Sequence, residues 1–193
     1  MFPRLIECVP NFSEGRDAGI VRGIREAIAA SPHVYVLGQT MDTDHNRSVI
    51  TFAGPPDEVA DAAFRGIEKA VELIDLNRHV GEHPRIGAAD VVPFVPLEGV
   101  TMEECARLAA RLGERVWSTL GVPVYLYEAA ARRDDRVRLE NIRRGQFETL
   151  KLEVLRNPER QPDIGGPELH PAAGAVAIGA RKFLLAFNIN LAT

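Results

Sequence analysis

The sequence predicts an α/β fold, a sandwich of β-strands and α-helices. Short apolar or β-branched runs alternate along the chain with longer stretches of helical periodicity. The composition, with 46% hydrophobic and 26% charged residues, is that of a globular protein that can bury a core. This alternation is compatible with helices on one face of the sheet or on both.

In the first half of the chain, prolines and glycines separate the predicted elements. Pro10 closes the first apolar run, Ser31-Pro32 ends the first helix because the residue before a proline avoids the α region, and Pro56 suits the first turn of the second helix. A polar loop, residues 40–47, joins two strands. The expected strands are residues 5–9, 34–37 and 48–52, and the expected helices are residues 17–30 and 56–74.

The second half continues the alternation. Thr101 and Glu104 form a capping-box pattern at the start of a helix, and Gly121 is placed to end it. Residues 156–173 are rich in Pro and Gly and are expected to form an ordered loop. The expected strands are residues 91–95, 124–127, 175–178 and 183–189, and the expected helices are residues 101–120 and 141–155.

Length and charge narrow the function classes. A chain of 193 residues provides one domain, or one and a fraction. The formal net charge of -4 argues against a nucleic-acid partner attracted by bulk charge. With only 2 cysteines there is no disulfide framework, which favours a reducing, cytoplasmic compartment. Neither a secretory signal nor a bilayer-spanning apolar run is recognised, so we expect no membrane partner.

The segment around His79 and His83 is the first candidate site. It matches the inverted zinc-protease pattern H-x-x-E-H, but Gly81 and Pro84 oppose the continuous helix that this chemistry needs. The same residues suit an active-site loop, because an unperturbed histidine exchanges protons near neutral pH and an arginine, Arg85, follows closely. A solvated surface loop is an equally good interpretation.

Two further loops carry polar groups. The loop at residues 42–47 has the charge to bind a small ion or ligand, although a solvated hairpin loop is the commoner structure and a divalent metal the weakest alternative. Residues 163–174 contain Gly165-Gly166-Pro167, which can expose successive backbone N–H groups, although a plain crossover loop is commoner.

The remaining conspicuous residues have structural interpretations. Cys8, Cys105 and Trp117 are expected to be buried or at an interface. A basic stretch alternates with acids and is expected to form a solvated, salt-bridged surface; its arginines are Arg132, Arg133, Arg136 and Arg138.

Several long blocks in order resemble one family. They read ECVPNFSEG, DHNRSVITFAG, GEHPRIGAADVVPF, GVTMEEC, GVPVYLYEAA, IRRGQFE and GARKFLLAFNINL, and they are spread over essentially the whole chain. The sequence is similar to the glutamate formimidoyltransferases, folate-dependent enzymes of histidine breakdown. This resemblance implies a homodimer of chains with two α/β subdomains, the first having helices on one face of a mixed sheet. Residues 1–178 then correspond to the N-terminal subdomain, and residues 179–193 to the opening strand of the second.

The resemblance also implies a reaction. A formimino group moves from N-formimino-L-glutamate to N5 of tetrahydrofolate, a co-substrate, and glutamate is released, with no metal. A related one-carbon cargo such as formyl remains an alternative, as do a non-catalytic folate-binding module and an interaction protein whose terminal strand pairs with a partner. The family's catalytic histidine corresponds to His83. Its folate loop corresponds to Gly165, Gly166, Pro167, Glu168, Leu169, His170, Pro171, Ala172, Ala173 and Gly174.

Substrate-orienting roles follow from charge and position rather than from the family. Both substrates carry carboxylates, which arginines bind bidentately. We therefore expect His45, Asn46, Arg47 and Arg85 to orient the substrates. Animal members carry an aspartate near the position of Thr40, so if that acid positions His83, Asp42 or Asp44 must replace it here.

Overall fold

The computed structural model describes residues 4–184 and contains a mixed, seven-stranded sheet. The strands are β1 (Leu5–Cys8), β2 (Asn11–Phe12), β3 (Tyr35–Asp42), β4 (Arg47–Gly54), β5 (Ala89–Glu98), β6 (Val124–Glu128) and β7 (Val176–Ala180). The helices are α1 (Ala18–Ala29), α2 (Pro56–Leu73), α3 (Met102–Leu120), α4 (Leu139–Arg143) and α5 (Gln146–Glu153), with short 3-10 turns at Asp134–Arg136 and Pro158–Arg160.

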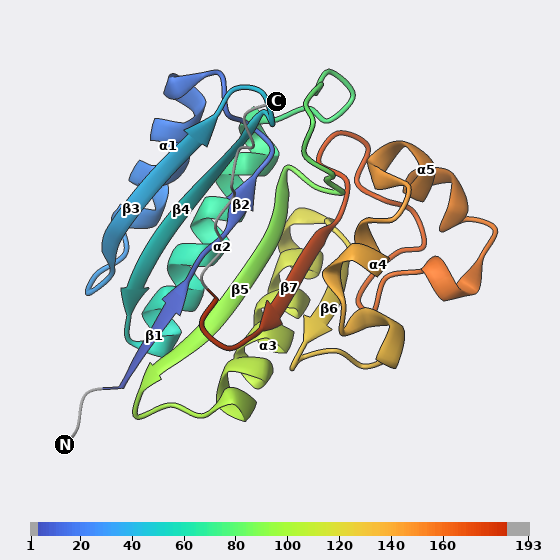
Figure 1. Cartoon of the computed structure of the whole chain (residues 1–193). Coiled ribbons are helices and arrows are strands. Elements are labelled where there is room, and N and C mark those ends of the chain that lie inside the picture. Colours follow the sequence, from blue (N-terminus) through green and yellow to red (C-terminus); the bar gives the residue numbers. More distant parts are fainter. Residues whose placement is uncertain (1–3, 185–193) are drawn as a thin grey trace, which may run out of the picture.

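The sheet has an antiparallel half and a parallel half (Figure 1). β3 pairs with β4, and β1 and β2 lie between β4 and β5 as one strand broken at Val9-Pro10, all of them antiparallel. β7 then lies between β5 and β6 and is parallel to both. The short strand β2 was not expected, because turn-forming residues surround it in the sequence. It pairs with β4 and, across an irregularity in register, with β5.

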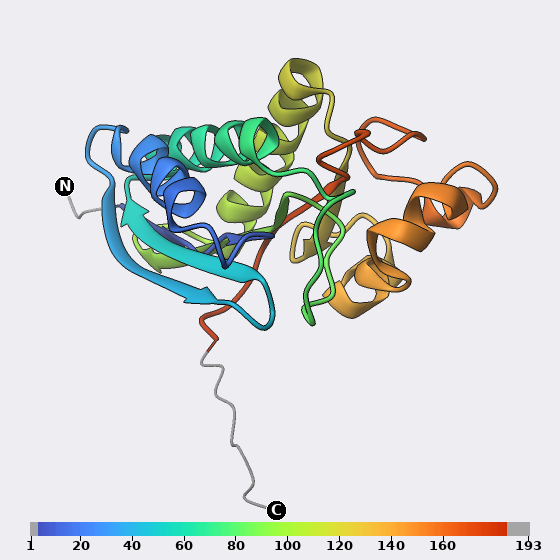
Figure 2. The same cartoon turned by 90° about the horizontal axis from the view of Figure 1, so that it is seen from above.

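The long helices α1, α2 and α3 cover one face of the sheet, as expected (Figure 2). Their apolar sides and alternate strand residues such as Ile6, Ile50 and Phe52 form the main core. A second, smaller core lies at the β6–β7 end, where Ile142 and Leu150 contact tyrosines of β6. On the opposite face, α4 and α5 cover that end of the sheet (Figure 2). No helix within residues 4–184 covers the part over β4, β1 and β2, which is the open face of the sheet.

The ends of most elements follow the local signals in the sequence. Asp17 caps α1, the capping box of Thr101 and Glu104 is formed, and Gly121 ends α3 in the left-handed conformation. The helix expected over residues 141–155 is wrong in one respect, because Gly145, also left-handed, divides it into α4 and α5. β3 extends to Asp42, so the expected loop 40–47 shrinks to a tight turn.

The C-terminal expectations fall at the border of the described residues. β7 continues to Ala180, so it crosses the expected subdomain boundary at residue 178. Of the strand expected at residues 183–189, Phe183 and Leu184 lie in irregular chain, and the rest lies outside the described residues. No helix within residues 4–184 has the length and apolar character needed to cross a membrane.

Candidate functional site

A cleft of about 560 Å³ lies on the open face of the sheet, between the strands and α4. Alternation along β4 builds it: Ser48 and Ile50 point into the helical core, while Arg47 and Val49 point to the open face. Apolar side chains from neighbouring strands form its floor, and charged side chains surround them. The lining residues are Val9, Asn11, Arg47, Val49, Val91, Pro93, Tyr127, Glu128, Arg138, Leu139, Glu140, Arg143, Arg181 and Leu184.

The β3–β4 turn holds the loop that carries His83. The Asn46 side chain accepts a hydrogen bond from the Gly15 N–H at 2.9 Å and donates one to the Val80 carbonyl at 3.1 Å. The backbone N–H of His83 donates to the His45 carbonyl. A Cβ at Gly81 would overlap that same carbonyl, so only glycine permits this close approach. The two loops are therefore fixed side by side.

Arg85, an expected substrate-orienting residue, is used to fasten this loop instead. Its guanidinium is 4% exposed and donates to the His79 ring nitrogen, the His79 carbonyl, Gln146 and both oxygens of Glu148. Every N–H of the group thus has a partner in the protein. Asn46 is likewise engaged at both ends of its amide, so the geometry favours structural roles for these two residues.

His79 is held as a neutral ring. Its Nε2 lies 2.9 Å from the Asn46 carbonyl, to which it must donate, and its Nδ1 accepts from Arg85. Burial lowers the pKa of His79, and the nearby Arg85 charge adds to that effect against the opposing Asn46 hydrogen bond. The segment at residues 79–83 is not helical, which excludes the zinc-protease arrangement. Residues 4–184 contain no cluster of potential ligands that would hold a metal.

His83 meets a buried carboxylate that the sequence interpretation missed. Its Nε2 lies 3.7 Å from Asp90 Oδ2, and the Asp90 side chain is 1% exposed. The same oxygen accepts from Arg143 at the end of α4, and Asp90 Oδ1 accepts from the Ile86 N–H at 2.8 Å. Burial opposes ionisation of Asp90, but Arg143, His83 and Ile86 outweigh it and hold the pKa below its usual value.

The acid beside His83 is therefore Asp90, not Asp42 or Asp44. Asp42 accepts from His45 Nδ1 at 2.9 Å and caps the turn, which places both side chains on the exposed hairpin. The sequence carried one signal for Asp90, a lone carboxylate opening an otherwise apolar strand in the block GAADVVPF. For Arg143 there was none, since its role depends on where α4 packs.

Arg47 and Arg143 bring two cations to the cleft. The Nε atoms of both are enclosed and without a hydrogen-bond partner among the described residues. Burial lowers the pKa of Arg47, and the like charge of Arg143 lowers it further, while Asp42 and Asp90 oppose this. Two cations with unused donors, placed beside an apolar floor, suit an anion that also has an apolar body.

The loop of residues 165–174 lies against the base of the His83 segment. Ala172 and Ala173 carbonyls accept from Leu76 and Ala88, and the His170 ring accepts from the backbone of the same turn. The first part of the loop turns at Gly165, where φ is +79° and the backbone touches the Trp117 ring. A hollow of about 250 Å³ lies between this loop and α5; it is lined by Asn77, Phe147, Lys151, Leu152, Leu155, Glu168, Leu169, His170 and Pro171.

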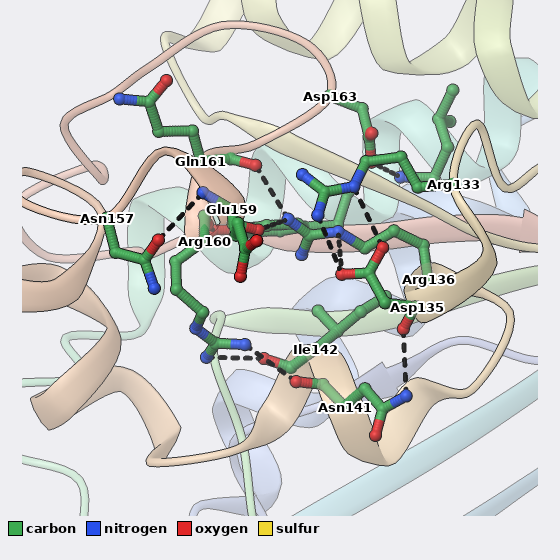
Figure 3. Close-up of polar contacts among 12 residues, drawn as sticks. Arg133, Asp135, Arg136, Asn141, Ile142, Asn157, Glu159, Arg160, Gln161 and Asp163 are labelled. Carbon is green, nitrogen blue, oxygen red and sulfur yellow. Dashed lines mark hydrogen bonds and ion pairs between the residues drawn. The ribbon is translucent and has the colours of Figure 1, made fainter.

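Two buried arginines hold the α4–α5 region on the sheet (Figure 3). Arg160 donates to the carbonyls of Asn141, Ile142 and Arg144, which end α4. Arg136 is 1% exposed, donates to the Glu159 carbonyl at 2.6 Å, and lies over the Tyr125 ring. The expectation that Arg136 belongs to a solvated surface is therefore wrong.

The remaining structural expectations fare differently. Arg133 pairs with Asp135 at the surface, as the sequence indicated. Cys8 and Cys105 are free and buried, as expected. Trp117 is 37% exposed, with its ring against Gly165.

Comparison with known families assigns the fold. Residues 5–181 match the family model described as the formiminotransferase domain, N-terminal subdomain. The chain belongs to the formiminotransferase family. This membership agrees with the mixed sheet and with the long helices gathered on one of its faces.

Curated relatives of this formiminotransferase chain align over nearly all of it. A glutamate formimidoyltransferase of Thermoplasma acidophilum is 54% identical, over 98% of this chain and 62% of the relative. A glutamate formimidoyltransferase of Streptococcus pyogenes serotype M1 is 43% identical, over 98% of this chain and 63% of the relative. A formimidoyltransferase-cyclodeaminase of Sus scrofa is 48% identical, over 97% and 35%. The chain thus spans less than two thirds of the length of these relatives.

Proposed function

We propose that this chain supports formimino transfer from N-formimino-L-glutamate to N5 of tetrahydrofolate, with release of glutamate, in histidine degradation. The relatives named glutamate formimidoyltransferase supply the reaction class. The observation that carries the proposal is the position of His83, a titratable ring with a buried carboxylate behind it and an arginine-lined cleft nearby.

The chemistry requires two proton transfers. N5 attacks the formimino carbon to give a tetrahedral intermediate, and N5 loses its proton. The bond from that carbon to the glutamate nitrogen then breaks, and the leaving nitrogen gains a proton. One histidine that accepts the first proton and returns it for the second step serves both transfers. Holding the reacting ends of both substrates against each other beside His83 supplies a large further part of the rate.

The substrates divide between the two hollows. Residues 168–171 of the expected folate loop line the hollow beside α5, and we assign tetrahydrofolate to this side. Arg47 faces the other cleft and is assigned a substrate carboxylate. His45 is half exposed on the adjoining turn and is assigned a lesser orienting role. We also propose, from the family, a cytoplasmic homodimer; light scattering coupled to size exclusion tests the dimer.

The first experiment measures glutamate release from N-formimino-L-glutamate by the purified chain, with and without tetrahydrofolate. Folate-dependent release is the expected result. No release with retained folate binding would instead support a non-catalytic folate-binding module. A parallel assay with the N-formyl analogue shows whether the cargo is formimino or formyl.

The second experiment tests His83. Replacing it by alanine should abolish release while tetrahydrofolate binding and the melting temperature stay close to those of the parent chain. His33→Asn is the matched control, because His33 is exposed and its φ of +59° suits asparagine. Release that survives in His83→Ala would refute the catalytic assignment.

A further inference from the structure

Asp90 connects the His83 ring, the proposed catalytic group, to Arg143, one of the arginines that line the cleft. It is the second residue of β5, and its carboxylate is almost completely buried. One oxygen accepts from the Ile86 N–H, and the other faces both Arg143 and His83. A buried carboxylate costs free energy unless it is paired, and here the side chains of Arg143 and His83 both face it from the side of the candidate site.

The two ring nitrogens of His83 have different surroundings. Nε2 is enclosed, makes no hydrogen bond, and faces Asp90 Oδ2 at 3.7 Å. A small rotation of the imidazole closes this distance to a hydrogen bond, as commonly happens when an active site binds its substrate. Nδ1 is not among the enclosed unpaired atoms and makes no hydrogen bond within residues 4–184. It is therefore the nitrogen left for a substrate.

We propose that Asp90 is a positioning residue that fixes neutral His83 as the Nε2–H tautomer, so that Nδ1 carries the lone pair that accepts and returns the proton. The Nε2–H group donates to the carboxylate, which accepts only, and the negative charge stabilises the imidazolium formed in the reaction. Arg143 donates to the same Asp90 oxygen that His83 faces, so Asp90 fixes the Arg143 guanidinium relative to the imidazole. The link to formimino transfer rests on the proposed function, whereas the assignment of the His83 tautomer rests only on its contacts.

The decisive measurement is made on the unmodified chain. Ring ¹⁵N chemical shifts at a pH where the histidines are neutral should show the Nε2–H tautomer for His83, whose signal is assigned by its loss in His83→Gln. The same spectrum contains references: the contacts of His79 and His170 require Nε2–H, whereas His45 donates from Nδ1 to Asp42. A dominant Nδ1–H form of His83 would overturn the proposal.

Asp90→Asn provides the perturbation. The asparagine oxygen keeps the bond from Ile86, but its amide donates toward His83 Nε2 and so favours the Nδ1–H tautomer. We expect the tautomer to switch and kcat to fall roughly 10²- to 10⁴-fold, with a smaller change in KM. Asp61→Asn is the matched control, because Asp61 is an exposed carboxylate of α2 on the other face of the sheet. It should change neither the His83 tautomer nor kcat.

Folding of the variant is checked by its melting temperature. Asp90→Asn leaves Arg143 without its carboxylate partner. If this single variant unfolds, the His83 tautomer is measured instead in the double variant Asp90→Asn/Arg143→Met, which removes both charges. An unswitched tautomer with unchanged kcat in a folded variant would refute the positioning role. If the parent chain releases no glutamate, the proposed function fails while the tautomer of His83 still decides the role of Asp90.

Discussion

Replacing Arg85 by methionine separates a structural role from the substrate-orienting role that its sequence position suggested. Methionine keeps much of the aliphatic stem and removes all donors. Hydrogen bonds to the His79 ring, the His79 carbonyl and Gln146 are lost, and each contributes about 1 kcal/mol. The ion pair to Glu148, whose side chain is 56% exposed, adds about 0.5–1 kcal/mol after allowance for solvent screening.

The expected loss is therefore about 3–4 kcal/mol in the free energy of unfolding, mostly because buried acceptors lose their donor. For a chain of this length, 1 kcal/mol corresponds to about 2–4 °C, so Tm should fall by about 6–16 °C. Thermal unfolding followed by circular dichroism, with chemical denaturation as a second measure, tests this. KM for either substrate should change little in the fraction that stays folded.

Arg47→Met is the matched comparison. Arg47 has an unpaired Nε and faces the cleft, so its loss should leave Tm within about 2 °C, the range of ordinary surface substitutions. KM for N-formimino-L-glutamate should rise at the same time. The reasoning would be refuted if Arg85→Met melted like the parent chain and raised KM, because Arg85 would then be a substrate ligand.

Three further outcomes follow from the contacts. Gly81→Ala should lower both Tm and kcat, because its Cβ overlaps the His45 carbonyl and separates the two loops; assays at matched folded fraction distinguish the effects. Burial lowers the pKa of His79 in the folded chain, so its stabilisation is complete above the unfolded value of about 6.5 and is lost as the pH falls from there through the folded value. Tm should therefore drop as the pH falls below about 6.5, and less so in His79→Gln. Tetrahydrofolate should shift the emission of Trp117, the single tryptophan, and Gly165→Ala should abolish that shift.

The sequence predicted those parts of the fold that local physics decides. Periodicity, prolines and caps located the long helices and most strands, because each signal lies within one turn or one strand of the element it defines. The break at Gly145 and the short strand β2 were missed because both depend on tertiary packing. A glycine inside an apolar helical pattern is tolerated too often to mark a break by itself.

For the candidate site, the sequence indicated segments but not the contacts between them. The loop with His83 lies beside the turn that precedes Arg47, a proximity that neither motif indicated. Sequence position alone could not show that Arg85 turns inward to His79, or that Arg143 arrives from a distant helix. Arg143 reaches Asp90 because of the way α4 packs on the sheet. Arg160, from the 3-10 turn at Pro158–Arg160, holds α4 in that position.

The place of β1 in the sheet has a consequence for synthesis. β1 leaves the ribosome before both of its partners, β4 and β5, which end at residues 54 and 98. Translation at about 5–20 residues per second delays the second partner by about 5–20 s. The β3–β4 hairpin joins neighbours in sequence and forms earlier. β1, which is already synthesised, can then pair with the other edge of β4, so a nascent chain carries β1 with its far edge unpaired until β5 follows. The speed of translation through residues 55–98 sets how long that edge stays open to chaperones or to other chains.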